Sequence, residues 1–221
     1  MGAFTGVKEF FNRPLADVAK AMGYDEDNIL ILKGDEQGLM TNYPETYNNI
    51  LSCKHHADSR KQFEYAQDLV ASWLMEDYVL SFLMSSKYEL SLDGADRKRK
   101  ILPSSRTSAS SDYLLSCNGV SIPVELMNDY TGFWAKKHVL HLRDDKFLKL
   151  KRSSSLLLAI STPSKNFTIY DFRSEVTARY LEYHQLYHKP AYELDIPDDI
   201  MIPLTQQNLE QKLIALLQKK N

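Results

Sequence analysis

Two acidic residues, Asp112 and Glu125, have a type and spacing that could support metal-ion chemistry. Asp112 lies in a predicted strand over residues 110–115, and Glu125 lies in the next predicted strand, over 121–127. A tight Asn-Gly turn between the strands is typical of a β-hairpin, so the two carboxylates are expected to face each other. Mg²⁺ prefers such carboxylate oxygens, together with water and phosphate oxygens. The pattern therefore predicts a magnesium site.

The neighbours of Glu125 support this interpretation. Ile-Pro-Val precedes Glu125 and Leu-Met follows it, which makes the strand look buried. A buried carboxylate requires a partner or a metal, because burying an unpaired charge is costly. The alternative is that Asp112 and Glu125 are two surface acids that flank an ordinary turn.

The elements around this pair predict one α/β domain with a central mixed sheet. A window without Gly or Pro predicts the longest helix over 58–84, and helical pieces are expected within 133–150. The hairpin strands are expected to join others in the sheet. These additional strands are predicted over 88–92, 155–161 and 167–172.

The two ends of the chain have weaker patterns. Near the start, the sequence predicts a helix over 15–22, a strand over 29–32 and a loop over 35–47. Near the end, a helix is predicted over 175–187, and Thr205 is expected to cap a last amphipathic helix. We expect a single domain over 1–221, with an N-terminal elaboration over 1–60, a core over 61–172 and a C-terminal helical part over 173–221.

This order of elements and acids resembles the PD-(D/E)XK nuclease superfamily, which includes many restriction endonucleases. The resemblance spans roughly residues 61–172 and implies a restriction-endonuclease-like core. By this resemblance Asp112 matches the first motif acid and Glu125 the second, and both would bind Mg²⁺. Glu64 matches the acid that many members contribute from the leading helix.

One position departs from the motif. The residue two after Glu125 is Met127 where the family has lysine, and strand alternation places both side chains on the same face. A thioether cannot hold a charge or orient water electrostatically. The lysine could have migrated to the following helix, with Lys136 favoured and Lys137 next. Otherwise another ligand substitutes, or the domain is a binding remnant or an inactivated variant.

Positive charge is concentrated in the middle of the chain. The net charge is −2, but residues 87–152 contain 13 Lys or Arg against 8 Asp or Glu. Such a cluster can form a surface that faces phosphates, although an ordinary solvated face is the alternative. The residues expected to contact DNA phosphates are Arg97, Lys98, Arg99, Lys100 and Lys137.

Together these features predict a Mg²⁺-dependent DNA endonuclease, most specifically a type II restriction enzyme that acts on double-stranded DNA as a homodimer. The alternatives are a non-catalytic DNA-binding or assembly module on the same scaffold, or an enzyme on an unrelated α/β fold. No apolar run is long enough to span a membrane. Cys53 and Cys117 are read as free thiols, so we expect a cytoplasmic protein.

Overall fold

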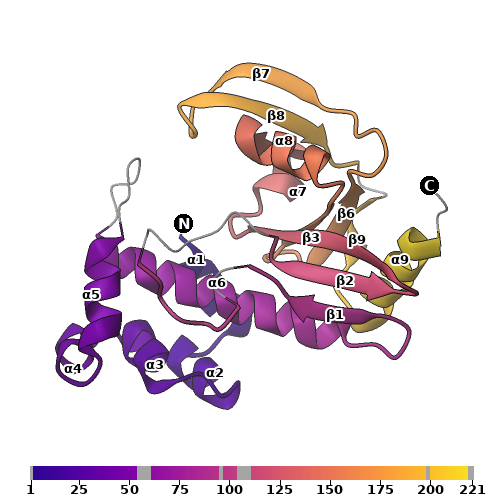
Figure 1. Cartoon of the computed structure of the whole chain (residues 1–221). Helices are drawn as coiled ribbons and strands as arrows, with labels where there is room; N and C mark the ends of the chain where they lie inside the picture. Colours follow the sequence, from indigo (N-terminus) through magenta and orange to yellow (C-terminus); the bar gives the residue numbers. More distant parts are fainter. Residues whose placement is uncertain (1, 54–60, 95–96, 104–110, 198–199, 219–221) are drawn as a thin grey trace. The chain divides into compact units, whose positions relative to one another are not determined.

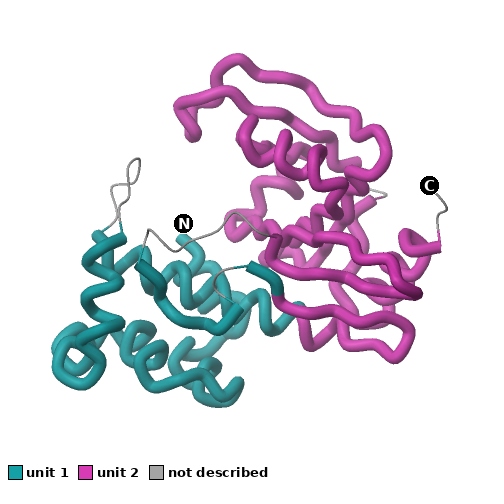
Figure 2. The backbone as a smooth tube through the Cα atoms, viewed as in Figure 1, with its two compact units in different colours: residues 1–79, 93–110 teal, residues 80–92, 111–221 magenta. Residues whose placement is uncertain are grey.

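A computed structural model describes the chain except residues 1, 54–60, 95–96, 104–110, 198–199 and 219–221. The chain divides into two compact units, shown in different colours in Figure 2. Unit 1 comprises residues 1–79 and 93–110, and unit 2 comprises residues 80–92 and 111–221. Both hairpin acids, Asp112 and Glu125, therefore belong to unit 2.

The elements of unit 1 are helices (Figure 1). They are α1 (Ala3–Phe11), α2 (Leu15–Ala21), α3 (Glu26–Lys33), α4 (Glu36–Asn42), α5 (Pro44–Ser52) and most of α6 (Gln62–Leu83). The predicted helices over 15–22 and 58–84 correspond to α2 and α6, and residues 58–60 of the second prediction lie outside the described chain. Fully buried Ile31, Trp73 and Leu74 are among the side chains that form the core of this unit.

The strand predicted over 29–32 is wrong, because these residues lie in α3. All four are buried, so the helix presents apolar side chains on every side and shows no amphipathic period. A short apolar run of this kind cannot be assigned to helix or strand by periodicity. Gly34 ends the helix with a left-handed backbone at φ +75°, a conformation that glycine adopts without strain.

The loop predicted over 35–47 is also wrong, since α4 and the start of α5 occupy it. The side chain of Asp35 caps α4 by accepting a hydrogen bond from the Gly38 N–H at 2.8 Å. Pro44 stands at the start of α5, where its missing N–H would have no helical partner. Asp35 and Pro44 thus mark the starts of two helices within the predicted loop.

Unit 2 contains the mixed sheet expected from the sequence. Its six strands have the order β1-β2-β3-β5-β6-β9, with β3 and β5 parallel and every other neighbouring pair antiparallel. They are β1 (Glu89–Leu92), β2 (Tyr113–Cys117), β3 (Val120–Asp129), β5 (Leu156–Ser161), β6 (Asn166–Asp171) and β9 (Ile202–Pro203). Every residue of β5 is buried, as its central position requires. The fold class is therefore mixed α/β.

The connection between the parallel strands β3 and β5 contains two helices and a strand. It contains α7 (Phe133–Lys137), β4 (Val139–Arg143) and α8 (Asp144–Arg152). The two helices match the pieces expected within 133–150, whereas β4 was not predicted. Buried Trp134, Phe147 and Leu157 belong to one hydrophobic cluster, so α7, α8 and β5 share a core.

The helix predicted over 175–187 is wrong. Residues 179–184 form strand β7 (Arg179–His184), which pairs with β8 (Lys189–Asp195) in a second sheet of order β4-β8-β7. Aromatic residues such as Tyr180 and Tyr183 favour strands, and both are exposed on this edge strand. Pairing with β8 therefore determines the secondary structure of a segment whose local sequence pattern is ambiguous.

The final helix agrees with the prediction. It is α9 (Gln206–Gln218), and the Thr205 hydroxyl accepts a hydrogen bond from the Asn208 N–H at 3.2 Å. Leu209, Leu213 and Leu216 of this helix are buried.

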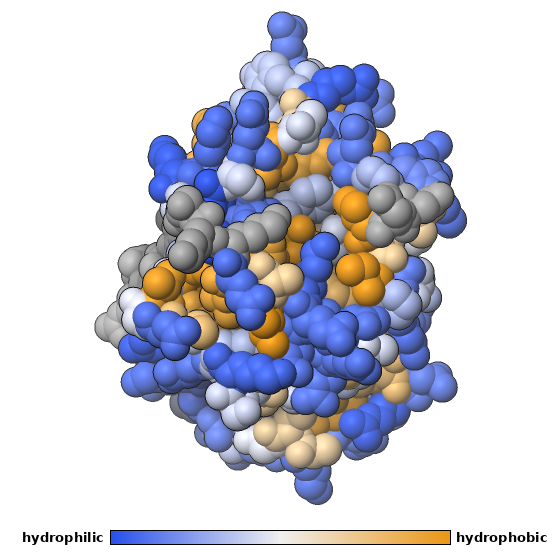
Figure 3. All heavy atoms as spheres, turned by 90° about the vertical axis from the view of Figure 1, so that its right-hand side faces the viewer, coloured by the Kyte–Doolittle hydropathy of each residue, from blue (hydrophilic) through white to orange (hydrophobic). Residues whose placement is uncertain are grey.

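The surface of the protein is largely polar on the face shown in Figure 3, where hydrophobic side chains form separate patches among hydrophilic ones. Among the described residues, no helix combines the length and apolar character needed to cross a bilayer.

Candidate functional site: two carboxylates and two lysines in unit 2

The β2–β3 hairpin places Asp112 and Glu125 opposite each other. Its ladder starts with Tyr113 paired to Val124, so the two acids occupy the next position along the same register. Asn118 and Gly119 form the turn, with φ of +50° and +79°. A two-residue turn with both φ values positive matches the twist of the strands, which fixes this register.

Asp112 lies on a bend immediately before β2. At this position the side chain of Asp112, in place of its backbone, forms a hydrogen bond to β3. Its Oδ2 accepts a hydrogen bond from the Leu126 N–H at 2.6 Å. This hydrogen bond fixes the Asp112 carboxylate against β3, beside Glu125. Neither Asp112 nor Glu125 lies on a helix. A helical position for either residue would have excluded the hairpin site expected from the sequence.

Glu125 lies within β3 and is 6% exposed. Each of its carboxylate oxygens has its own lysine partner from α8. Lys146 Nζ forms an ion pair with Oε1, and Lys149 Nζ lies 3.1 Å from Oε2. The buried carboxylate is therefore neutralised by two ammonium groups, as burial of a charge requires.

Lys146 has an unusual electrostatic environment. Burial lowers the pKa of its ammonium to about 8, and the positive charge of Lys149 acts in the same direction. The negative charge of Asp112 opposes this shift, so Asp112 also interacts with Lys146. Asp112, Glu125, Lys146 and Lys149 together form a cluster of two negative and two positive side chains, which we call the charge cluster.

Met127 and Asp129, which follow Glu125 on the same face of β3, have structural roles. Met127 packs against the hydrophobic cluster that contains Trp134 and Phe147. Asp129 accepts hydrogen bonds from the Thr131 N–H at 2.9 Å and the Trp134 N–H at 3.0 Å, and so holds the start of α7. A partly buried apolar side chain that packs against the core thus occupies the position of the motif lysine.

The lysines that contact Glu125 are not those favoured from the sequence. Lys136 and Lys137 are exposed on α7, whereas Lys146 and Lys149 come from α8. A signal for them exists in the sequence, because two lysines three residues apart on a helix share one face. In the sequence these lysines stand out only as part of the basic middle of the chain.

Glu64, expected as a third acid, belongs to unit 1. It lies in the first turn of α6, where its Oε2 accepts a hydrogen bond from the Lys61 N–H at 3.0 Å. This contact is typical of an acid that stabilises the start of a helix. The structure thus gives Glu64 a local role in helix α6.

The basic run over 97–100 also lies in unit 1, and two of its members have acidic partners. The Arg99 guanidinium lies 2.6 Å from both a Glu76 and an Asp77 oxygen. Lys100 Nζ lies 2.6 Å from Asp25 Oδ2 and 3.8 Å from Asp27 Oδ2. Arg97 and Lys98 are exposed and remain the members of the run expected to face phosphates.

These ion pairs predict a structural role for Arg99. Its side chain is 11% exposed, and Arg99→Met would leave the carboxylates of Glu76 and Asp77 partly buried without their cation. We expect the free energy of unfolding to fall by about 3 kcal/mol, measured by urea denaturation. Lys98→Met, at an exposed site, is the matched control and should change it by less than about 0.5 kcal/mol. Equal losses for the two variants would contradict this role.

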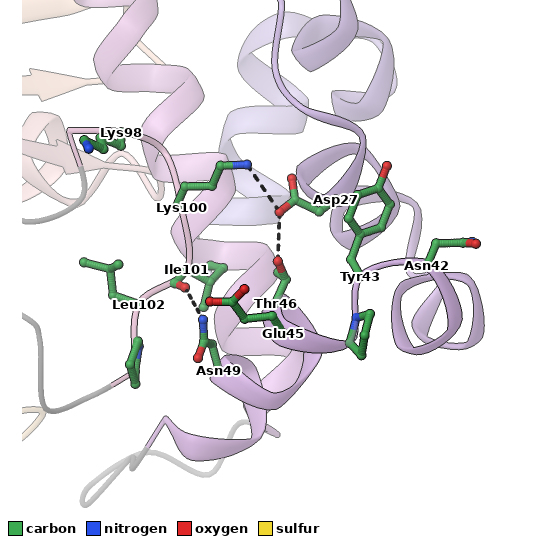
Figure 4. A pocket seen from close by; sticks show the side chains of 12 residues that line it. Asp27, Asn42, Tyr43, Glu45, Thr46, Asn49, Lys98, Lys100, Ile101 and Leu102 are labelled. Carbon is green, nitrogen blue, oxygen red and sulfur yellow. Dashed lines mark hydrogen bonds and ion pairs between the residues drawn. The ribbon is translucent and has the colours of Figure 1, made fainter.

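A pocket of about 770 Å³ lies within unit 1 beside the same run. It is lined by Asp27 of α3, the end of α4, the start of α5, and residues 98 and 100–103. Figure 4 shows the Lys100 ammonium directed at Asp27 and the Asn49 amide directed at the Ile101 carbonyl. These contacts hold residues 98–103 against the helices and leave the cavity walls with balanced charge.

The charge cluster offers a divalent cation two carboxylates, those of Asp112 and Glu125. Within the described part of the chain, no group of three or more His, Cys, Asp or Glu side chains could hold a metal. Mg²⁺ is commonly bound through one or two carboxylates, with water and substrate phosphates as its remaining ligands. The donor set of Asp112 and Glu125 fits this ion, provided that the two lysines leave Glu125.

No protein-family model matches the chain, and no curated protein has significant sequence similarity to it.

Proposed function

We propose that this protein is a Mg²⁺-dependent DNA endonuclease of the PD-(D/E)XK type, with a type II restriction enzyme as its specific form. The observation that carries the proposal is the charge cluster. Asp112 and Glu125 stand opposite each other on a hairpin, and Lys146 contacts Glu125 from an adjacent helix. Paired carboxylates beside a lysine are groups that can support metal-assisted phosphodiester hydrolysis.

Asp112 and Glu125 would hold the magnesium ion. When bound, the ion supplies Lewis-acid chemistry that favours ionisation of water and stabilises the leaving oxygen of a phosphodiester. The buried position of Glu125 and the backbone hydrogen bond of Asp112 fix both carboxylates before substrate arrives. Such preorganisation lowers the cost of reaching the transition state.

Lys146 would replace the lysine that is absent at Met127. The side chains of Met127 and Lys146 both lie between β3 and the helices that follow it. Lys146 therefore reaches the acids from α8 and not from β3. Burial lowers the pKa of Lys146, which favours its uncharged form, and in that form its amine can take a proton from water. The charged form can instead stabilise a phosphate oxygen.

Cleavage of both DNA strands supports a homodimer within this proposal. One such site per chain cuts one strand, and a two-fold dimer matches the symmetry of a duplex with antiparallel strands. Arg97, Lys98 and Lys137 are exposed and would contact phosphates, which position DNA without reading its sequence.

Incubation of the pure protein with plasmid DNA tests the proposal directly. We expect discrete fragments with Mg²⁺ and none when EDTA replaces it, because the acids act through a cation. Nicking or smearing would instead indicate a nuclease without restriction specificity. Intact plasmid under all conditions, over a range of plasmids and Mg²⁺ concentrations, would contradict the nuclease function.

One observation favours a second candidate, a non-catalytic DNA-binding or assembly module. The four side chains of the charge cluster neutralise one another, and Met127 is partly buried and packs against the hydrophobic core. A scaffold that no longer cuts could retain both features. Duplex binding in a gel-shift assay, without any cleavage in Mg²⁺, would identify this function.

A further inference from the structure

The charge cluster sets a condition on cation binding. Both oxygens of Glu125 are already in contact with ammonium groups, one from Lys146 and one from Lys149. Asp112 interacts with Lys146 as well. A cation that approaches the two acids therefore meets a site whose two negative and two positive charges balance.

A cation that binds alone would have to displace both lysines from Glu125. The side chains of Lys146 and Lys149 are 25% and 28% exposed, so neither can regain full hydration in place. Leaving such partly buried charges beside a divalent cation and without an anion is costly. Cation binding by the free protein is consequently weakened by the lysines.

A phosphate group reverses this cost. Its oxygens can accept the hydrogen bonds that the ammonium groups lose, while the cation takes over the carboxylates and shares a phosphate oxygen. With two carboxylates, two ammonium groups, one divalent cation and DNA phosphates, the charges again come close to balance. Each ligand thus removes the obstacle to the other.

We propose that Lys146 and Lys149 couple cation binding to DNA binding, by holding Glu125 in the free protein and transferring to phosphate when cation and duplex bind together. This inference rests on the proposed function and assigns a role to Lys149, which has no counterpart in the motif. It makes Lys149 a positioning residue that acts through Glu125. Because coupling between two ligands is reciprocal, each must raise the affinity of the other by the same factor.

Calorimetric titration of the full chain with Ca²⁺, in the absence and presence of a saturating mixed-sequence duplex, measures the coupling. Ca²⁺ takes the same oxygen ligands, and a gel run afterwards checks that the duplex is intact. We expect the duplex to raise Ca²⁺ affinity about tenfold or more, and Ca²⁺ at constant ionic strength to raise duplex affinity by the same factor.

Lys149→Met separates the lysine from the cation site itself. Without this ammonium, Oε2 of Glu125 is available, so Ca²⁺ should bind the free variant more tightly than it binds the unmodified protein. The factor by which the duplex raises Ca²⁺ affinity should shrink accordingly. Lys151→Met, an exposed lysine on the same helix, is the matched control and should leave that factor unchanged.

The outcomes distinguish this inference from the proposed function. Tight Ca²⁺ binding that the duplex does not change would overturn the coupling and leave the metal site standing. No Ca²⁺ binding with or without duplex would overturn the metal site, and the coupling with it. Should Lys149→Met not fold, an absence of reciprocal coupling in the two titrations of the unmodified chain would still overturn the inference.

Discussion

Asp112→Asn is expected to reduce the rate of plasmid cleavage at least about a hundredfold while the protein stays folded. Asparagine has nearly the same shape, and its side-chain oxygen can still accept the hydrogen bond from the Leu126 N–H. The substitution removes the negative charge that the cation requires. Loss even of groups that only support a metal ligand costs about 10- to 100-fold, so loss of a ligand should cost more.

Asp145→Asn provides the matched control for this variant. It makes the same chemical change at an exposed residue in the first turn of α8, where Asp145 pairs with Arg143. Cleavage by this variant should remain within about twofold of the unmodified protein. If Asp112→Asn and Asp145→Asn cut plasmid DNA at the same rate, the hairpin carboxylates are not the catalytic acids.

Lys146→Met is expected to lower the cleavage rate by about 10²- to 10³-fold, which is typical of removing one group that stabilises the transition state. Methionine fills a similar space and carries no charge, and Lys149 still neutralises Glu125. Duplex affinity should fall less than about tenfold, because a single phosphate contact is lost. A quantitative cleavage assay at saturating protein, combined with a gel shift, separates the two effects.

Lys136→Met is the comparison that decides between the two helices. Lys136 is exposed on α7, whereas Lys146 contacts Glu125 from α8. We expect Lys136→Met to cut DNA at close to the normal rate. The opposite result, with Lys136→Met inactive and Lys146→Met active, would restore the migration favoured from the sequence.

The sequence was most informative where short-range chemistry determines structure. The Asn-Gly turn and the alternation of its strands predicted the β2–β3 hairpin, and with it the opposed positions of Asp112 and Glu125. It was least informative where tertiary packing decides. Residues 29–32 are helical because α3 is buried on all sides, and residues 179–184 form a strand because β8 pairs with them.

The candidate site shows the same division. The acids could be predicted, because they lie on one hairpin and their spacing is local. The lysines could not be assigned, because their contact with Glu125 depends on how α8 returns to β3 after a further helix and strand. Met127 marked the absence of a motif lysine, but nothing in its neighbourhood indicated which later residue would replace it.

The side-chain hydrogen bond that extends the β2–β3 ladder has a consequence for how this region can vary. Asp112 faces Glu125 because a turn of fixed length sets the register of the hairpin. A register shift of one residue would turn every side chain of the shifted strand to the other face of the sheet. Insertion of one residue into the turn between Cys117 and Val120 would therefore preserve the site only if the longer turn kept Tyr113 opposite Val124. The pairing of Tyr113 with Val124, and not the sequence of either strand alone, is therefore what any variant of this hairpin must keep for the two acids to face each other.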